Sequence, residues 1–271
     1  MTPGPPPPRR NERPARRALS AEGAVRNGRD GRGGRGRPAA VLWDMDGTLV
    51  DSERLWDVSL AELAVSLGGQ LSPSTRTAMV GTDMATTLRM MFDEVGREAT
   101  PAAVAAAWDE LTERTARLFA TDIPWLPGAA AALADVCTAG LPAALVTSTT
   151  RDLTELALDT IGRQFFDATV CGDEVRHTKP HPEPYLRAAA LLGVDAADCV
   201  AVEDSPNGAT SAEAAGCTVV VVASEVSVPD GPRRIAVPSL VGVGSAELAT
   251  AYHRGRSVVH DPVEQRPLGS P

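Results

Sequence analysis

Residues 39–53 read AAVLWDMDGTLVDSE and hold the contrast that decides the fold. The apolar run from Ala39 to Trp43 has the length and composition of a buried strand. It ends on Asp44, and Asp46 follows one residue later. Two carboxylates this close repel each other, and both lose solvation beside a core. The stretch therefore predicts a strand whose end carries a functional site.

The same kind of strand recurs further along the chain. Short apolar runs rich in β-branched residues lie at 142–147, 168–172, 199–203 and 217–223. Helical patterns accompany them at 128–138, 151–161, 182–192 and 207–215. Continuous apolar strands that alternate with helices indicate a parallel sheet covered on both faces. We expect an α/β, Rossmann-like core domain built from residues 39–53 and 126–245.

The interval 54–125 breaks this alternation, because one helical pattern follows another. Apolar side chains recur there at spacings of three and four, as at Leu60, Leu63 and Leu67. The sequence predicts an all-helical cap domain inserted after the first strand. The crossings near 52–55 and 122–127 would be its hinges.

The ends of the chain differ from this body. Residues 1–38 carry ten Arg against three acids, a net charge of +7, and are rich in Pro and Gly. Such a segment buries too little apolar surface to offset its ordering entropy, so we expect a disordered tail. The total charge of −9 leaves −16 on the remainder, which disfavours general binding to nucleic acid. Residues 246–271 are predicted to form a flexible C-terminal tail.

The four cysteines form no CxxC pair and have no histidine cluster beside them, which indicates buried thiols in a reducing compartment. The chain contains no secretory apolar segment and no apolar run of the ~20 residues that a membrane span needs. We expect a cytoplasmic, soluble protein, either a monomer or a weak dimer, without membrane partners.

Polar side chains follow the predicted strands, and the carboxyl ends of parallel strands meet at one edge of a sheet. In strand order, the residues at these strand ends are Asp44, Asp46, Gly47 and Thr48; Thr147 and Ser148; Lys179; and Glu203 and Asp204. Lys179 is the one lysine among 26 basic residues, which marks a position that needs a compact ammonium. Four carboxylates stay ionised together only beside a cation, and oxygen ligands with a phosphate favour Mg²⁺. A metal, hydrogen-bond donors and a free carboxylate suit phosphoryl transfer.

These motifs resemble those of the haloacid dehalogenase-like hydrolase superfamily. The resemblance rests on DMDGT, the hydroxyl pair after LVT, the Lys of HTKPHPEPY and the EDSPNG loop, in this order, and covers about residues 39–245. It is strongest to the phosphatase and beta-phosphoglucomutase-like branch, whose members carry a helical cap. The resemblance implies a Mg²⁺ cofactor and a small phosphorylated metabolite as substrate.

The family pattern also implies a role for each position. Asp44 would be the nucleophile that forms an aspartyl-phosphate, and Asp46 would be the general acid and then the general base. Thr147 and the Ser148 amide would bind the transferring phosphoryl group, while Lys179 would pair with Asp44 and a phosphoryl oxygen. The implied metal ligands are Asp44, the Asp46 carbonyl, Asp204 and Glu203, the last directly or through water. Expected contacts with substrate are Gly47 and Thr48 in the first loop, and Trp56, Thr82 and Met84 in the cap.

Features of this chain narrow the family's chemistries. Dehalogenase members lack the second Asp, and phosphonatase members need a cap lysine, which 54–125 does not contain. Trp56 and Met84 stand where sugar phosphomutases carry a His and an Arg. Hydrolysis of a small phosphomonoester is favoured, with a sugar or polyol phosphate first because DSERLW and KPHPEPYL look like sugar-phosphatase motifs. The alternatives are a phosphomutase, a nucleotide or phosphoglycolate phosphatase, and a non-enzymatic, RNA-associated protein that binds phosphoesters.

Overall fold

The computed structural model describes residues 36–80, 82–121 and 123–257, and its centre is a six-stranded parallel sheet in the order β3-β2-β1-β4-β5-β6. The strands are β1 (Ala40–Trp43), β2 (Ala143–Val146), β3 (Ala168–Val170), β4 (Cys199–Glu203), β5 (Thr218–Val222) and β6 (Arg234–Val237). The quoted stretch supplies β1 in the middle of the sheet. Because all strands run the same way, the segments that follow β1, β2 and β4 emerge at one edge.

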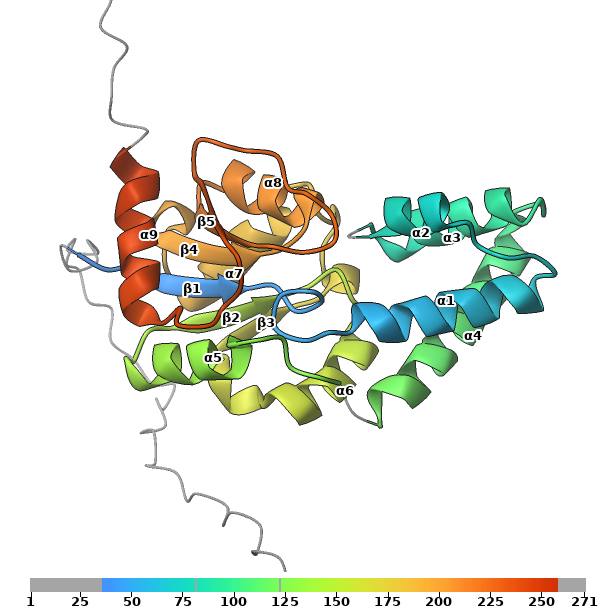
Figure 1. The fold of residues 1–271 in the computed structure, drawn as a ribbon, viewed down its shortest axis with the longest axis horizontal. Coiled ribbons are helices and arrows are strands. Elements are labelled where there is room, and N and C mark those ends of the chain that lie inside the picture. The colour runs from blue at the N-terminus through green and yellow to red at the C-terminus, as the bar shows by residue number, and fades with distance from the viewer. Residues whose placement is uncertain (1–35, 81, 122, 258–271) are drawn as a thin grey trace, which may run out of the picture. The chain divides into compact units, whose positions relative to one another are not determined.

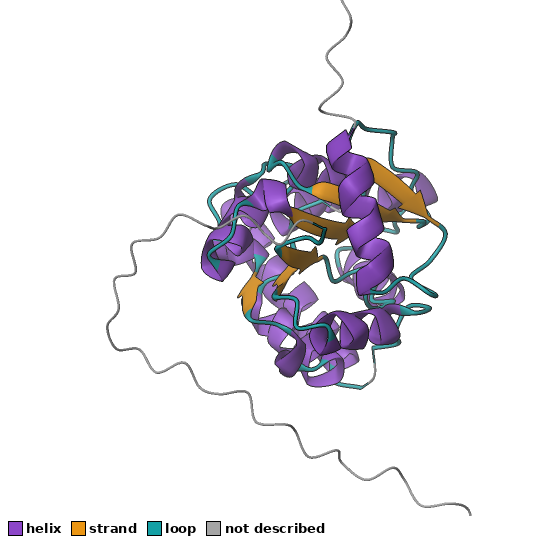
Figure 2. Ribbon diagram, turned by 90° about the vertical axis from the view of Figure 1, so that its left-hand side faces the viewer, coloured by secondary structure: helices purple, strands orange, loops and turns teal. Residues whose placement is uncertain are grey.

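The sheet lies between two helical layers (Figure 1, Figure 2), and alternating side chains of its central strand pack toward one or the other. Val41 and Trp43 pack toward α5 (Ala129–Thr138), α6 (Arg151–Ile161) and α9 (Ser245–Ser257). Ala40 and Leu42 pack toward α7 (Glu183–Leu192) and α8 (Pro206–Ala214). The three short 3-10 turns are η1 (Arg163–Phe165), η2 (Gly172–Glu174) and η3 (Ala196–Asp198). The predicted α/β core is confirmed.

Four helices form the cap and share a core of their own. They are α1 (Glu53–Ser66), α2 (Pro73–Met79), α3 (Met84–Glu94) and α4 (Pro101–Phe119). Leu63, Leu88, Met91 and Leu111 are fully buried among them. The sequence patterns singled out no helix at residues 73–79, so α2 is an addition. It is only two turns long, and its start depends on the Ser72 side chain, which accepts a hydrogen bond from the amide of Thr75.

The two crossings between core and cap are hydrogen-bonded to each other. The amide of Asp51 donates to the carbonyl of Pro124 at 2.8 Å, and the amide of Leu126 donates to Leu49 at 3.0 Å. Val50 and Trp125 form an antiparallel bridge between these contacts. The cap is therefore attached through one paired segment, which is where hinge motion was predicted.

The prediction of a flexible tail over 246–271 is wrong for its first part, because α9 extends to Ser257. Leu248, Ala251 and Tyr252 are buried against the sheet, and the Tyr252 hydroxyl donates to Asp198 at 2.9 Å. The segment is polar on average and has only a narrow apolar stripe. Such a stripe predicts a buried helix only when the sheet face that it covers is known. Strand β6 was also missed. Residues 258–271 and nearly all of the predicted N-terminal tail lie outside the described residues.

Three of the predicted buried thiols are confirmed, at Cys171, Cys199 and Cys217. Burial raises the pKa of Cys171 to about 11 and of Cys199 to about 12, so both are protonated, unreactive thiols near neutral pH. Within the described ranges, none of the helices combines the length and the apolar character needed to cross a bilayer.

Candidate active site

The sole lysine lies at the centre of a buried polar cluster at the carboxyl edge of the sheet. Its Nζ donates to Asp44 Oδ1 at 2.7 Å, to Glu203 Oε1 at 2.6 Å and to the carbonyl of Val146 at 3.0 Å. An ammonium has three protons, so all of its donor capacity is used. Side chains from β1, β4 and the loop before α7 thus meet at one point, as the sequence predicted.

Glu203 is the most enclosed member of this cluster. Its Oε1 also accepts from the Tyr185 hydroxyl at 2.5 Å, and its Oε2 accepts from Ser205 Oγ at 3.1 Å and from two backbone amides. A Cβ at Gly208 would lie about 2 Å from the carboxylate, so only glycine fits there. These contacts hold Glu203 as a positioning residue for Lys179. Direct metal ligation by Glu203 stays a prediction.

Burial and mutual repulsion shape the charges of the site. Burial, then the charge of Glu203, raises the pKa of Asp44 to about 7 against the pull of Lys179. The pKa of Asp204 is raised well above its usual range by burial and by Asp44 and Glu203. Burial by itself lowers the pKa of Lys179, but the charges of Asp44 and Glu203 together raise that pKa above its usual range. When all three carboxylates are ionised, their charge exceeds that of the one ammonium in this buried site.

That excess is what a divalent cation would neutralise. Oxygen atoms of Asp44, Glu203 and Asp204 lie within 4.8 Å of one another. Asp44 Oδ2 is buried and, among the described residues, has no hydrogen-bond partner. Gly47, at φ +77°, lies so near Asp204 that a Cβ there would be 2.3 Å from Oδ2. Carboxylates with an unpartnered oxygen fit Mg²⁺ as the sequence predicted.

Asp46 accepts four hydrogen bonds, two from the cap side and two from the core. Ser52 Oγ at 2.6 Å and the Trp56 indole N–H at 3.3 Å bind Oδ1. The hydroxyls of Thr147 at 3.0 Å and Thr149 at 2.8 Å bind Oδ2. Thr147 was predicted to bind a phosphoryl group, and in this structure its proton points to Asp46 instead.

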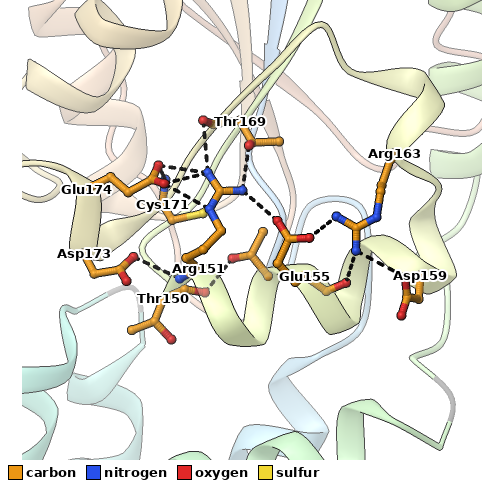
Figure 3. Close-up of polar contacts among 10 residues, drawn as sticks. Thr150, Arg151, Glu155, Asp159, Arg163, Thr169, Cys171, Asp173 and Glu174 are labelled. Carbon is orange, nitrogen blue, oxygen red and sulfur yellow. Dashed lines mark hydrogen bonds and ion pairs between the residues drawn. The ribbon is translucent and has the colours of Figure 1, made fainter.

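The loop after β2 is fixed by the first residue of α6, Arg151 (Figure 3). Its guanidinium binds Glu174 through Nε at 3.0 Å and Nη2 at 2.8 Å, and Glu155 at 3.0 Å. Its backbone amide donates to Asp173 at 2.9 Å. These contacts tie the loop with Ser148 to the loop after β3, the segment that leads toward Lys179. Gly172 is required at this crossing, since a Cβ would lie 2.1 Å from the Ser148 carbonyl.

A cleft lies above Asp44 and Asp46, and the cap forms its opposite wall. The empty volume of the cleft, including the part open to solvent, is about 790 Å³. The cleft is lined by Trp56, Thr82 and Met84 together with Ser148 and Lys179. The structure therefore brings the three predicted cap residues to the site. Gly47 and Thr48 instead line a second cavity on the far side of Asp204, so their predicted substrate contact stays a prediction.

The cap also contributes an ion pair that the sequence reading missed. Arg76, on α2, binds Glu53 at 2.6 Å and also pairs with Asp57. Burial raises the pKa of Glu53 despite its bond to Arg76. Glu53 and Arg76 both line the cleft. Glu53 stands in the quoted motif and could have been singled out, whereas Arg76 lies in the helix that was not predicted.

Comparisons with known proteins now decide the family. A family model described as haloacid dehalogenase-like hydrolase matches residues 41–222. The chain belongs to the haloacid dehalogenase-like hydrolase family. It therefore belongs to a family of enzymes. The matched segment begins in β1 and ends in β5.

Individual relatives of this hydrolase agree. The chain is 35% identical over 190 residues to hexitol phosphatase B of Escherichia coli strain K12, a match that spans 68% of this chain and 82% of the relative. CbbY from Rhodobacter sphaeroides, solved with phosphate, superimposes with a TM-score of 0.71 at 27% identity, over 78% of this chain and 99% of that one. A beta-phosphoglucomutase from Clostridium difficile superimposes with a TM-score of 0.72 at 20% identity, covering 82% and 99%, which supports the fold alone.

Proposed function

We propose that this hydrolase is a Mg²⁺-dependent phosphatase that cleaves a small sugar or polyol monophosphate through an aspartyl-phosphate on Asp44. The observation that carries the proposal is that the two oxygens of the Asp44 carboxylate have different surroundings. Asp44 lines the cleft; its Oδ1 is held by Lys179 at 2.7 Å, while its Oδ2 has no hydrogen-bond partner in the part of the chain that the structure describes. A carboxylate that is fixed at one oxygen and keeps a lone pair uncommitted at the other is oriented for attack.

In the first step the Asp44 carboxylate attacks phosphorus, and the bond from phosphorus to the ester oxygen breaks. Asp46 gives its proton to that leaving oxygen. In the second step water attacks phosphorus, Asp46 accepts the proton, and the Asp44 carboxylate is regenerated as phosphate leaves. The hydroxyls of Thr147 and Thr149, both within hydrogen-bond distance of Asp46 in this structure, hold its carboxyl group in place at the cleft.

Asp44, Asp204 and the Asp46 carbonyl would hold Mg²⁺, with Glu203 acting directly or through water, and the ion would offset the charge of the phosphoryl oxygens. Lys179 contributes a second fixed positive charge at the nucleophile. Its partners Glu203 and Val146 set its position, so it needs little reorganisation during the reaction.

The charge of the cap wall supports a monophosphate with an uncharged remainder. The basic side chains that line the cleft are Lys179 and Arg76, and both are already paired with carboxylates. A second phosphate on the substrate would meet the Glu53 carboxylate near Arg76. Hydroxyl groups, by contrast, can donate to Glu53 and fill the cleft without bringing charge.

The same observation weighs against a phosphomutase. A mutase must bind a bisphosphate intermediate in both orientations, which requires a cation in the cap that is available to the second phosphate. The Trp56 indole instead donates to Asp46, and Arg76 has two acidic partners. Hydrolysis, with water as the second acceptor, suits this cleft better.

The test is release of free phosphate from a panel of phosphomonoesters with Mg²⁺ present. We expect hexitol and hexose monophosphates to be hydrolysed with higher kcat/KM than hexose bisphosphates. Asp44→Asn is the matched control, since it keeps size and hydrogen bonding but removes the nucleophile. Lack of hydrolysis of every member, including p-nitrophenyl phosphate, would contradict the phosphatase proposal. A clear preference for bisphosphates would overturn only the substrate class.

A further inference from the structure

A second cluster of metal-ligating side chains lies outside the acid site, on the loop that carries Lys179. His177, His181 and Glu183, here named the histidine cluster, offer ligand atoms within 4.8 Å of one another. The two imidazole rings lie 4.5 Å apart between centroids. Among the described residues, this is one of two groups in which three such ligands converge, and the other is the acid site.

The geometry is close to that of a bound ion. His177 Nδ1 and Glu183 Oε2 are 2.9 Å apart and form a hydrogen bond. Two ligands on a tetrahedral Zn²⁺, each about 2.1 Å from the ion, are themselves separated by about 3.4 Å. For this pair alone, replacing the hydrogen-bonded proton with a metal needs a movement of roughly half an ångström. The His177 side chain is 62% exposed, so water can complete the coordination.

The loop is already folded around this position. Glu183 accepts hydrogen bonds from the amides of Arg176 at 2.9 Å and His177 at 3.0 Å, and Ser211 Oγ donates to the His181 carbonyl at 2.6 Å. Ligands held by such contacts lose less conformational freedom when a metal binds. The contacts thus favour binding by a loop that is otherwise on the surface.

The ligand types of the histidine cluster favour a different ion from the one that the acid site favours. Two imidazoles with one carboxylate suit Zn²⁺ and its late first-row neighbours, whereas Mg²⁺ prefers oxygen ligands. We propose that the histidine cluster is a second divalent-cation site of the Zn²⁺ class, separate from the Mg²⁺ site. Lys179 lies between the two histidines in the chain, so a bound ion would restrain the loop that holds it. This inference does not depend on the proposed phosphatase activity.

The experiment is a calorimetric titration of the full chain with Zn²⁺ in a large excess of Mg²⁺, which occupies the all-oxygen site. We expect one equivalent of Zn²⁺ to bind to the wild-type protein. His177→Ala and His181→Ala should each weaken this binding at least about tenfold, because each removes one of three ligands. His253→Ala is the matched control, since His253 is an exposed histidine on α9, away from the cluster, and binding should be unchanged.

Two results would overturn the proposal. One is Zn²⁺ affinity that is unaffected by both cluster variants, and the other is an equal loss in His253→Ala. Circular dichroism and the melting midpoint in Mg²⁺ check that each variant is folded. A Co²⁺ titration of the wild-type protein gives a readout without variants. Four- or five-coordinate Co²⁺ with imidazole ligands should produce visible absorption bands, and only the weak spectrum of octahedral, oxygen-ligated Co²⁺ would contradict the site.

Discussion

The floor of the cleft and the cap wall opposite it both contain paired charges, but the pairs differ in burial. On the floor, Lys179 is 5% exposed, and each of its protons has a fixed acceptor. On the wall, Arg76 pairs with Glu53 and with Asp57, whose side chain is 55% exposed. Removing a partner from a buried pair leaves a charge without solvent, whereas a partly exposed pair is partly screened by water. The floor should therefore control whether the reaction occurs, and the wall should control which substrate reacts.

The largest expected effect is that of Asp44→Asn on the floor. The amide cannot form the aspartyl-phosphate, so kcat should fall by at least about 10³-fold on every substrate. The measurement is phosphate release under single-turnover conditions, together with acid-stable labelling of the protein by a radiolabelled phosphomonoester. Turnover close to that of the wild-type protein would rule out the covalent mechanism.

Lys179→Arg tests whether charge or shape matters on the floor. A guanidinium is planar and larger, and it cannot place three protons on Asp44, Glu203 and the Val146 carbonyl at once. We expect kcat to fall by about 10²-fold or more and the melting midpoint to drop. Arg151→Lys, a substitution of the opposite sense outside the cleft, is the control for general disturbance of the loops. An active Lys179→Arg enzyme would show that the floor needs only a positive charge.

On the wall, Glu53→Gln should change selectivity and leave the chemistry in place. Loss of the Glu53 charge leaves Arg76 with Asp57 alone, so a second phosphate is no longer repelled. We expect kcat/KM for hexose bisphosphates relative to monophosphates to rise by about tenfold. Asp57→Asn, at the more exposed partner, is the matched control and should shift the ratio less. An unchanged ratio in Glu53→Gln would mean that the wall does not select by charge.

The smallest effect concerns stability and its dependence on pH and Mg²⁺. In the metal-free protein the pKa of Asp44 is raised from 3.8 to about 7, so its protonated form favours folding at low pH. This contribution is lost as the pH rises from about 4 through about 7. Mg²⁺ binds the ionised carboxylates and should therefore raise the melting midpoint by a few degrees more at pH 8 than at pH 5. Calorimetry at both pH values checks this, and equal shifts would show that the acids are ionised without the metal.

Much of the floor could be predicted because its residues stand beside strong local signals. Asp44, Asp46 and Asp204 each follow an apolar run, and parallel strands bring such ends together whatever the rest of the chain does. Lys179 was marked by being the only lysine. The wall gave no such signal, because Arg76 is one of 25 arginines and lies on a two-turn helix.

Thus the sequence by itself determined the alternation of the first five strands with helices, the inserted cap and the acids that gather at the carboxyl edge of the sheet. These features follow from periodicity and from residues adjacent in the chain. The tertiary structure alone decided which partners hold those acids. Tyr185 on Glu203, Thr149 on Asp46 and Glu53 on Arg76 are contacts between side chains that meet only after folding. It also decided that α9 covers the sheet, since a polar helix with a narrow apolar stripe is stabilised only by the surface on which it packs.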